Sequence, residues 1–563
     1  MLMLGKALFR GSSEQTPAGS DAFALVSGAS MAVHQSSARW LRAFLSALTL
    51  GGLVIANAAT EGDFTYTTDG TSVTITGYVG AGGAATIPDS IQGIPVTSLA
   101  TRAFYGSARV TQITIPSSVA SIPALAFQYC TNLATIMIPS SITNIAGSAF
   151  YGCTALSSVT LPDSLISIGD SAFYCCIGLR NVIIPDSVSS LGGSAFGSCN
   201  QLISVTFGTN ITSIGWSAFS DCPHLPEVTI PDSITSLGDS AFSRCTSLGH
   251  VVLGAGVSSL GSSLFSGCSS LAYLTIRGAI TNVSDKAFYG CAGLMSAPLP
   301  NTLMNIGKWA FSGCTALASV AIPDGVTQLG ESAFSGCTHL ASITIGSGLT
   351  GVGKQVFERC SSLVEVSLGK GVSYIDATAF SGCYDLGVIA VDPFNLAYAD
   401  RNGVLFNKSQ DTLVLYPPAR SGDYAVPNGV TNVLDSAFSG CSKLTTLTVP
   451  DGVYSIGSAA FGNCYGLTNV MIGSGLTNIG DFAFRGCTRL QSVHFAGNAP
   501  SLVGSSVLDS ALHAVIYYNP GTAGWASIFA GVPTAAWGDP RPSKLRYAAS
   551  SFVIVFRLFF LLV

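Results

Sequence analysis

Three polar residues with catalytic potential, Glu227, His250 and Tyr273, follow one another at intervals of 23 residues, and Ser296 comes one interval later. A carboxylate beside an imidazole can orient it, as in a catalytic triad. If each interval is one coil of a stacked array, Ser296 lies about 10 Å from His250, whereas a nucleophile needs its base at about 3 Å. A flat strip also lacks the recess of a ligand pocket. We therefore predict a recognition strip of Glu227, His250 and Tyr273 without catalytic residues, with unremarkable surface as the alternative.

Cysteines form the second group with reactive chemistry. Fifteen of the 16 stand three residues after a recurring phenylalanine, from Cys130 to Cys487, and Cys175 is the exception. An even number in a secreted chain invites a disulfide framework. Equivalent residues of adjacent coils lie about 5 Å apart, within disulfide range, but their Cβ vectors run parallel. Because buried cysteine behaves as a small hydrophobe, we predict a ladder of buried free thiols.

Aspartates that follow a proline could bind calcium as paired carboxylates. Only two of them, Asp163 and Asp186, are one interval apart, and aspartate after proline is ordinary turn chemistry. We predict turn residues at all six positions: Asp89, Asp163, Asp186, Asp232, Asp324 and Asp451. The chain also has no C-x-x-C pair and no converging histidines, so we predict neither a metal site nor a cofactor.

A repeat of 23 residues positions all these groups. A phenylalanine, usually preceded by alanine, recurs at this interval 16 times: Phe104, Phe127, Phe150, Phe173, Phe196, Phe219, Phe242, Phe265, Phe288, Phe311, Phe334, Phe357 and Phe380, then Phe438, Phe461 and Phe484. One such unit cannot bury its apolar side alone, but stacked units bury one another.

The unit that begins at Phe150 illustrates the pattern. Val159 and Leu161 alternate with serine and threonine, which is typical of a half-buried strand, and Pro162-Asp163 ends it. Gly169 permits a turn before Ser171-Ala172-Phe173, which we interpret as a helical turn. The predicted fold class is an α/β repeat solenoid with one short strand and a compact helical or irregular crossover in each coil.

These units resemble the leucine-rich repeats of the BspA-type family of bacterial and protist surface proteins. The shared motif is I-P-x-x-V-x-x-I-G-x-x-A-F-x-G-C-x-x-L-x-x-V, over roughly residues 86–495. Residues 63–100 resemble the segment that opens such arrays, and residues 495–538 resemble a closing segment. The resemblance implies a curved solenoid, a cell-surface or secreted location and binding to proteins or host surfaces, without specifying one ligand.

The composition excludes other classes of protein. Hydrophobic residues make up 48% and charged residues 9%, against roughly 25% charged residues in an average domain. This balance opposes disorder. With a net charge of −5 and no basic run inside the array, the chain also lacks the footprint of a nucleic-acid-binding protein.

The N-terminal leader contains a predicted secretory signal. Arg39 and Arg42 form a basic region, an apolar stretch follows, and Ala56-Asn57-Ala58 is a small-residue cleavage site. The apolar stretch falls short of the about 20 residues of a membrane span, so we predict cleavage rather than anchoring. Met31 would begin an ordinary signal, which places it at residues 31–58. Whether residues 1–30 are translated stays open.

The C-terminal tail and a break in the array complete the organisation. Residues 552–563 are apolar apart from Arg557, and membrane association is expected only through this tail.

Between Phe380 and Phe438, the runs 404–406 and 412–416 flank a polar loop at 407–411, which predicts a hairpin. A structural insertion and a projecting binding island are both compatible with it. The predicted domains are a leader (1–58), an N-terminal cap (59–100), an array (101–386), an insertion (387–436), further repeats (437–494), a C-terminal cap (495–540) and a hydrophobic tail (541–563).

The function most consistent with these features is binding. We predict a secreted or cell-surface leucine-rich repeat protein, not an enzyme, that mediates adhesion or binding to a protein or cell-surface ligand and does not bind nucleic acid. The alternative is a structural envelope or spacer protein without a specific ligand.

Overall fold

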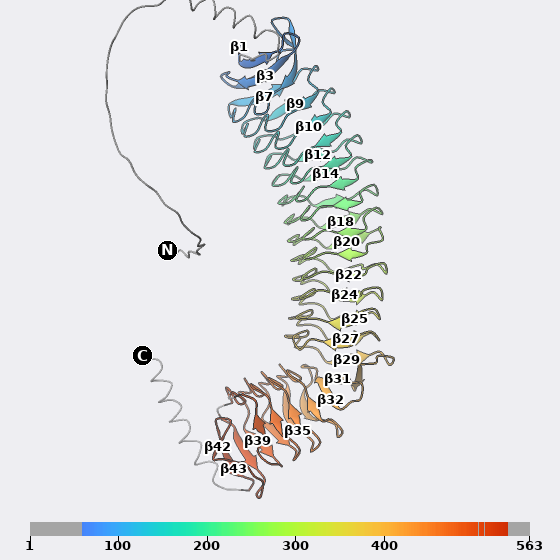
Figure 1. Ribbon diagram of the computed structural model, residues 1–563, viewed down its shortest axis with the longest axis vertical. Helices are drawn as coiled ribbons and strands as arrows, with labels where there is room; N and C mark the ends of the chain where they lie inside the picture. Colours follow the sequence, from blue (N-terminus) through green and yellow to red (C-terminus); the bar gives the residue numbers. More distant parts are fainter. Residues whose placement is uncertain (1–58, 505, 512, 539–563) are drawn as a thin grey trace, which may run out of the picture. The chain divides into compact units, whose positions relative to one another are not determined.

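The computed structural model describes residues 59–504, 506–511 and 513–538, which form stacked coils (Figure 1). The predicted signal at 31–58 and the tail at 541–563 lie outside the described residues. Within the described ranges, no helix has the length and apolar character that crossing a membrane requires.

A small sheet opens the described chain. Strands β1 (Ala59–Glu61), β2 (Phe64–Thr68) and β3 (Val73–Tyr78) are antiparallel. Strand β6 (Ile94–Leu99) then pairs parallel with β3 and antiparallel with β5 (Ser90–Ile91). The sheet thus changes from antiparallel to parallel pairing and starts the stacking direction of the later coils.

Most coils contribute one strand to the longer of two parallel ladders, but the strand predicted from the alternation of Val159 and Leu161 does not form in that coil. The pairs of this ladder join residues 23 apart in most coils. No strand is assigned at residues 157–161 or 294–300. The strands before the break are β4 (Gly83–Thr86), β7 (Val110–Thr114), β9 (Thr135–Met137), β12 (Asn181–Ile183), β14 (Ser204–Thr206), β16 (Glu227–Thr229), β18 (His250–Leu253), β20 (Tyr273–Ile276), β23 (Ser319–Ile322), β25 (Ser342–Ile345), β27 (Glu365–Leu368) and β29 (Val388–Val391).

After the break the same ladder resumes and ends in an antiparallel pair. Here β42 turns back against β43, and Trp525 stacks on Tyr518 with ring centroids 5.3 Å apart. These strands are β33 (Gly422–Ala425), β35 (Leu444–Val449), β37 (Asn469–Ile472), β39 (Ser492–Phe495), β41 (Val515–Tyr518), β42 (Ile528–Phe529) and β43 (Val532–Ala536).

A second ladder of two-residue strands was not predicted. The second residue of almost every such strand is Ile, Leu or Val turned into the core. The strands are β8 (Ser121–Ile122), β10 (Asn144–Ile145), β11 (Ser167–Ile168), β13 (Ser190–Leu191), β15 (Ser213–Ile214), β17 (Ser236–Leu237), β19 (Ser259–Leu260), β21 (Asn282–Val283), β22 (Asn305–Ile306), β24 (Gln328–Leu329), β26 (Gly351–Val352), β28 (Tyr374–Ile375), β34 (Asn432–Val433), β36 (Ser455–Ile456), β38 (Asn478–Ile479) and β40 (Ser501–Leu502).

The crossover at each repeat phenylalanine is not the predicted helical turn, and no helix occurs among the described residues. At Ser171-Ala172-Phe173 the chain forms hydrogen-bonded turns instead. Ser171 and Cys175 have φ angles of 54° and 57°, and such left-handed residues cannot propagate a right-handed helix. The N–H groups of Ser171 and Phe173 donate to the next coil, to the carbonyls of Gly193 and Ala195. The crossovers therefore form a third ladder of peptide groups, paired between coils.

The repeat phenylalanines and cysteines fill the core beside this third ladder. The rings of Phe150 and Phe173 stack with centroids 5.0 Å apart and planes 9° apart. Each cysteine of the repeat position is buried and free, as predicted, and its thiol points at a carbonyl of the preceding coil. Cys153 Sγ, for example, donates to the Phe127 carbonyl at 3.1 Å. Cysteine thus satisfies a buried backbone acceptor as well as filling space.

Thiol labelling gives a direct test of this ladder. Burial raises the pKa of Cys130 to about 12 and that of Cys176 well above its ordinary value, which suppresses the reactive thiolate. We expect folded protein to react at Cys175 alone, since this side chain is partly exposed, and denatured unreduced protein to react at all 16 cysteines. Cys175→Ser should remove the folded-state signal. Denatured protein that stays unlabelled without reductant would establish disulfides and overturn the free-thiol prediction.

The break in the array contains a three-stranded antiparallel meander. Strands β31 (Val404–Asn407) and β32 (Thr412–Leu415) form the predicted hairpin, and β30 (Tyr398–Arg401) adds an unforeseen third strand. Strand β32 also pairs parallel with β34, so the insertion passes directly into the short-strand ladder. The buried side chains of the insertion belong to two hydrophobic clusters. Leu405 packs with the coils before the break, and Phe406 packs with the coils after it.

A buried asparagine fastens the start of this insertion to the array. The Asn395 side chain donates from Nδ2 to the carbonyls of Gly369 and Val372, and its Oδ1 accepts from the N–H groups of Ala397 and Tyr398. Asn395 has no solvent exposure. One amide side chain thus satisfies four backbone groups where the regular coil ends.

Candidate functional site

The predicted strip lies on a single three-stranded sheet. Glu227, His250 and Tyr273 each begin a strand, β16, β18 and β20, and the three residues pair in register. All three side chains are exposed, with Tyr273 62% accessible. The His250 and Tyr273 rings meet edge to face with centroids 6.4 Å apart. The structure therefore brings the three predicted residues together as one surface strip.

The fourth residue considered, Ser296, does not extend this sheet. The sheet contains β16, β18 and β20 only, and residues 294–300 form no strand. The strip consequently presents a carboxylate, an imidazole and a phenol as recognition groups on an open sheet.

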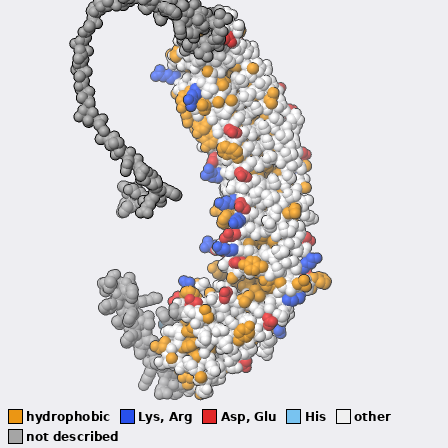
Figure 2. Space-filling model, in the orientation of Figure 1, with side chains coloured by type: hydrophobic (Ala, Val, Ile, Leu, Met, Phe, Trp, Pro, Cys, Tyr) orange, Lys and Arg blue, Asp and Glu red, His pale blue; other side chains and the backbone are white. Residues whose placement is uncertain are grey.

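The strand face around the strip is poor in charge. The strand positions beside it carry Thr229, Val252 and Thr275, and the next sheet begins with Ser319 and Ser342. Figure 2 shows the visible charged side chains gathered mainly along one edge of the coils. Charged crossover residues also form ion pairs: Arg244 Nε lies 2.8 Å from Asp221 Oδ1. The strip is thus a local chemical feature on a largely neutral face.

A second surface feature, a ladder of exposed and half-buried tyrosines, was not predicted from the sequence. The rings of Tyr105, Tyr129, Tyr151 and Tyr174 follow one another over four coils with centroids 5.8, 5.5 and 5.1 Å apart. The Arg102 guanidinium lies 5.6 Å from the Tyr105 ring centroid. Three of these tyrosines directly follow a repeat phenylalanine, which is the signal that could have located the ladder.

The aspartates after proline have a turn role, as predicted, and four of the six, Asp186, Asp232, Asp324 and Asp451, also reach the next coil. Asp186 Oδ1 accepts the Thr209 N–H at 2.7 Å, and Asp324 Oδ1 accepts the Ser347 N–H at 2.7 Å. The hydrogen bonds from Ser347 lower the pKa of Asp324. These carboxylates are hydrogen-bond acceptors between coils, and the described residues contain no cluster of three or more His, Cys, Asp or Glu able to hold a metal ion.

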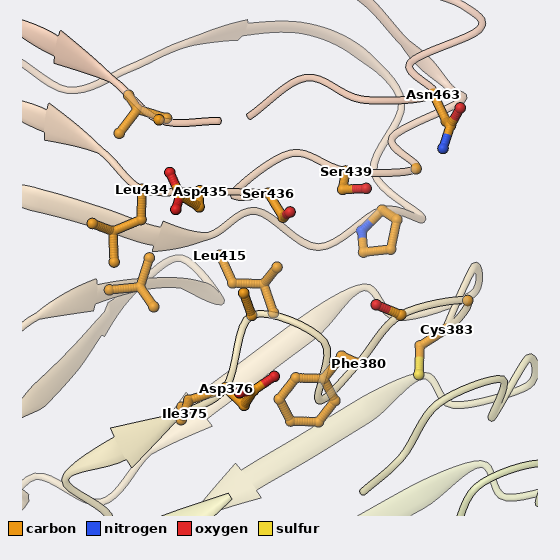
Figure 3. A pocket seen from close by; sticks show the side chains of 18 of the residues that line it. Ile375, Asp376, Phe380, Cys383, Leu415, Leu434, Asp435, Ser436, Ser439 and Asn463 are labelled. Atoms are coloured by element: carbon orange, nitrogen blue, oxygen red, sulfur yellow. The ribbon is translucent and has the colours of Figure 1, made fainter. Parts of the chain in front are cut away.

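A pocket of about 770 Å³ opens where the insertion interrupts the crossover ladder. Its size is within the range of small-ligand sites. Figure 3 shows Asp376 and Phe380 on one side and Asp435, Ser436 and Ser439 on the other, with Leu415 between them. The pocket exists because no crossover turn fills the position one repeat after Phe380, where the meander strands run instead. This dependence on the folded insertion explains why sequence spacing alone did not reveal it.

The Phe380 ring marks the floor of this pocket. It stacks on Phe357 with centroids 5.5 Å apart, and it is 8% exposed, whereas the other repeat phenylalanines are at most 1% exposed. On the far side, the ladder of rings resumes with Tyr416, which stacks on Phe438 at 4.8 Å. The pocket therefore combines one accessible aromatic ring with polar crossover residues.

Comparison with known proteins identifies the repeat. The model of the BspA type leucine-rich repeat region, with six copies, matches residues 97–222, 166–295, 281–398 and 422–522, which together are more than half of the chain. A search of curated proteins finds no match.

Solved structures with similarity to this chain include leucine-rich repeat proteins of bacteria. One from Bacteroides ovatus is 26% identical over 77% of this chain and 94% of its own, with a TM-score of 0.46. A leucine-rich cell surface protein from Faecalibacterium prausnitzii is 23% identical over 84% and 96%, with a TM-score of 0.29. A leucine-rich repeat protein from T. pallidum is 28% identical over 46% of this chain and 91% of its own, with a TM-score of 0.25. On the extent of the family match, the chain belongs to the BspA-type leucine-rich repeat family.

Proposed function

We propose that this chain is a secreted or cell-surface binding protein that contacts a protein or cell-surface ligand through its strand face and catalyses no reaction. The observation that carries the proposal is the strip of Glu227, His250 and Tyr273, held in register on one sheet. Aromatic side chains are favoured anchors of interfaces. Because neighbouring coils already fix these strands, a partner loses little entropy in ordering them.

The neutral strand face gives the proposed interface a distinct electrostatic character. Long-range steering requires charge of one sign, and the positions beside the strip are Thr229, Val252 and Thr275. Binding at this face therefore depends mainly on contact between surfaces and only weakly on salt concentration.

Substitutions in the strip test this proposal. We expect Tyr273→Ala and His250→Ala each to weaken binding to a partner captured from surface extracts by about 1–2 kcal/mol, because each removes an exposed interface group. The matched control is Thr344→Ala, on β25 of the next sheet, which should bind as the parent does. Circular dichroism checks that the variants keep their fold. Unchanged affinity of both strip variants would exclude the strip as the contact surface.

The hairpin loop is the rival location for binding. Asn407 Nδ2 donates to Asp411 Oδ1 at 2.7 Å, and the Asp411 carbonyl accepts the Thr431 N–H at 2.7 Å. Because these bonds are used inside the molecule, the loop is better suited to a structural role. Lys408→Ala leaves them intact and tests the loop; a binding loss in this variant alone would move the site to the insertion.

A structural spacer without a ligand is the alternative function. The serine- and threonine-rich coils beyond the strip, such as those of β23 and β25, are compatible with it. If the chain is a spacer, no surface extract yields a partner that binds it specifically. If it is a binding protein, the strip variants lose affinity for the captured partner and Thr344→Ala does not.

The proposed secretion has its own test. We expect the signal at residues 31–58 to be removed, so that the mature protein begins at or near Ala59, the first residue of strand β1. Mass spectrometry of protein from its native host measures this end directly. An intact leader on protein recovered from the cytoplasm would rule out the proposed location.

A further inference from the structure

One wall of the pocket at the break has two backbone donors without an acceptor. In an intact coil, the N–H groups of the repeat phenylalanine and of the residue two later donate to carbonyls of the next coil, as those of Phe288 and Gly290 do. Among the described residues, the corresponding N–H groups of Phe380 and Gly382 have no such acceptor. Because both residues line the pocket, an occupant that offers acceptors can satisfy these donors.

The chain itself takes the facing position of the crossover ladder. The Tyr416 N–H donates to the Ala437 carbonyl at 2.8 Å, and the Tyr416 ring stacks on Phe438. A strand-like peptide therefore cannot continue the ladder from one wall to the other. The space suits a compact ligand that accepts from the N–H groups on one side and uses side chains on the other.

Two carboxylates supply acceptors for such a ligand. Figure 3 shows Asp376 and Asp435 on opposite sides of the pocket. The Thr378 hydroxyl and N–H donate to Asp376 Oδ1 and lower the pKa of this carboxyl. The Ser458 N–H donates to Asp435 Oδ1 at 2.6 Å. Since a carboxylate has about four acceptor sites, each of these groups is held in place and still accepts hydrogen bonds from an occupant.

The charges that line the pocket favour an uncharged ligand. Glu358 and Arg359 lie 3.7 Å apart as an ion pair, whereas Asp376 and Asp435 have no cation within ion-pair distance in the described ranges. The excess negative charge repels an anion. A simple cation offers no acceptor and leaves the two backbone donors unsatisfied. A neutral molecule that carries both donors and acceptors matches the whole lining.

Aromatic rings add flat apolar surfaces to these polar groups. Tyr384 and Tyr465 line the pocket and are 59% and 49% exposed, and the Phe380 ring is partly accessible. A Cβ atom placed on Gly440 would lie 3.7 Å from Tyr384 Cε1. The Tyr384 ring thus reaches from the crossover before the break to the crossover after it. Such faces pack against apolar groups, among them the C–H faces of sugar rings.

We propose that the pocket at the break binds an uncharged saccharide, either a free oligosaccharide or the end of a glycan. Its hydroxyl oxygens accept the N–H groups of Phe380 and Gly382, and its hydroxyl hydrogens bond to Asp376 and Asp435. Its C–H faces pack against the Tyr384 ring. A sugar supplies donors, acceptors and apolar faces in one compact neutral molecule. This site is separate from the strand-face strip, so either can fail without the other.

Saccharide binding by the full chain tests the proposal. The probes are uncharged di- and trisaccharides of glucose, galactose, mannose and N-acetylglucosamine, used free in solution and linked to a surface through the reducing end. We expect saturable binding of at least one free probe, and at least tenfold weaker binding of its counterpart with one uronic acid. Binding of the linked form as well indicates a glycan, and binding of the free form alone indicates a soluble oligosaccharide. Failure of every uncharged probe at millimolar concentration would overturn the proposal.

Two variants with matched controls locate the binding in the pocket. Tyr384→Ala removes the exposed ring and Ser439→Trp fills the cavity from an exposed position, so each should weaken saccharide binding at least tenfold. Tyr289→Ala and Ser312→Trp make the same changes on the crossovers of intact coils and should bind as the parent does. Circular dichroism checks the fold. A loss of equal size in a variant and its control would place the binding outside the pocket and refute the site.

The preference for an uncharged ligand has a test of its own. Asp435→Asn keeps an oxygen for the Ser458 N–H but removes the charge, so the preference for the uncharged over the acidic probe should fall at least threefold. Asp285→Asn is the matched control, because Asp285 holds the same repeat position and accepts the Lys308 N–H at 2.7 Å outside the pocket. A preference that changes equally in both variants, or in neither, contradicts the proposed contacts.

Amide hydrogen exchange shows whether the two backbone donors are used. We expect the amides of Phe380 and Gly382 to exchange rapidly in the free full chain and to slow at least tenfold in the presence of saturating saccharide. Slow exchange in the free chain would overturn the proposal, because these donors would already have an acceptor within the protein. Rapid exchange that saturating saccharide leaves unchanged would overturn it as well.

Discussion

Phe242→Ala is expected to lower the local free energy of unfolding by about 3–5 kcal/mol. The Phe242 ring has no solvent exposure and stacks between Phe219 and Phe265, with centroids 5.4 and 5.7 Å away. Its removal leaves a cavity that its neighbours cannot close, since each ring is held by its own coil. Native-state hydrogen exchange of the coils on either side measures the loss.

The damage should remain near the substituted coil. In a solenoid each repeat contacts only its neighbours, so stability is approximately a sum of local terms. The control is Phe482→Ala, at an exposed phenylalanine outside the ring ladder, which should cost about 1 kcal/mol or less. Equal loss of protection in the first and last coils of Phe242→Ala would contradict this local coupling.

Asn395→Ala is expected to destabilise the insertion by about 3–4 kcal/mol. The substitution leaves the Val372 carbonyl and the N–H groups of Ala397 and Tyr398 without a partner, and leaves the Gly369 carbonyl only its long bond from the Val372 N–H, at 3.4 Å. Each unsatisfied buried group costs about 1 kcal/mol or more. Limited proteolysis should show faster cleavage within residues 387–436 than in the coils before Phe357.

Asn210→Ala is the matched control for this substitution. The Asn210 side chain is exposed and makes one hydrogen bond, to the Asp186 carbonyl, so its loss should cost about 0.5–1 kcal/mol. If Asn395→Ala were cleaved no faster than Asn210→Ala, the buried amide would not be what fastens the insertion to the array.

The regular part of the fold was predictable because one period controls it. Phe150 and its equivalents mark each coil, and the alternation of apolar and polar residues predicts the strand face of most coils, such as β12 and β14, although residues 157–161 form no strand. The hairpin followed from two apolar runs around Asn407–Asp411. The strip residues could be placed together for the same reason, because register on a parallel ladder follows directly from the 23-residue interval.

The crossovers were predicted incorrectly because their conformation leaves little trace in residue type. Ser171, Arg244 and Trp309 all adopt positive φ, although glycine is the residue that signals this region most clearly. Pairing with the next coil offsets the cost of these conformations, and that pairing is invisible in a single unit. The pocket was missed for a related reason: its lining includes Phe380 before the insertion, Leu415 within it and Asp435 after it, and only the fold brings these residues together.

The central claim, that a ligand is bound on the strand-face strip, is tested most directly by hydroxyl-radical footprinting of the chain with and without its captured partner. Side-chain oxidation reports solvent access, and Tyr273 is 62% exposed in the free chain. The predicted result is slower oxidation of Tyr273 and His250 in the complex, with Tyr105 and Tyr465 unchanged. Unchanged oxidation of Tyr273 and His250 in a saturated complex would contradict the claim and place the ligand elsewhere on the molecule.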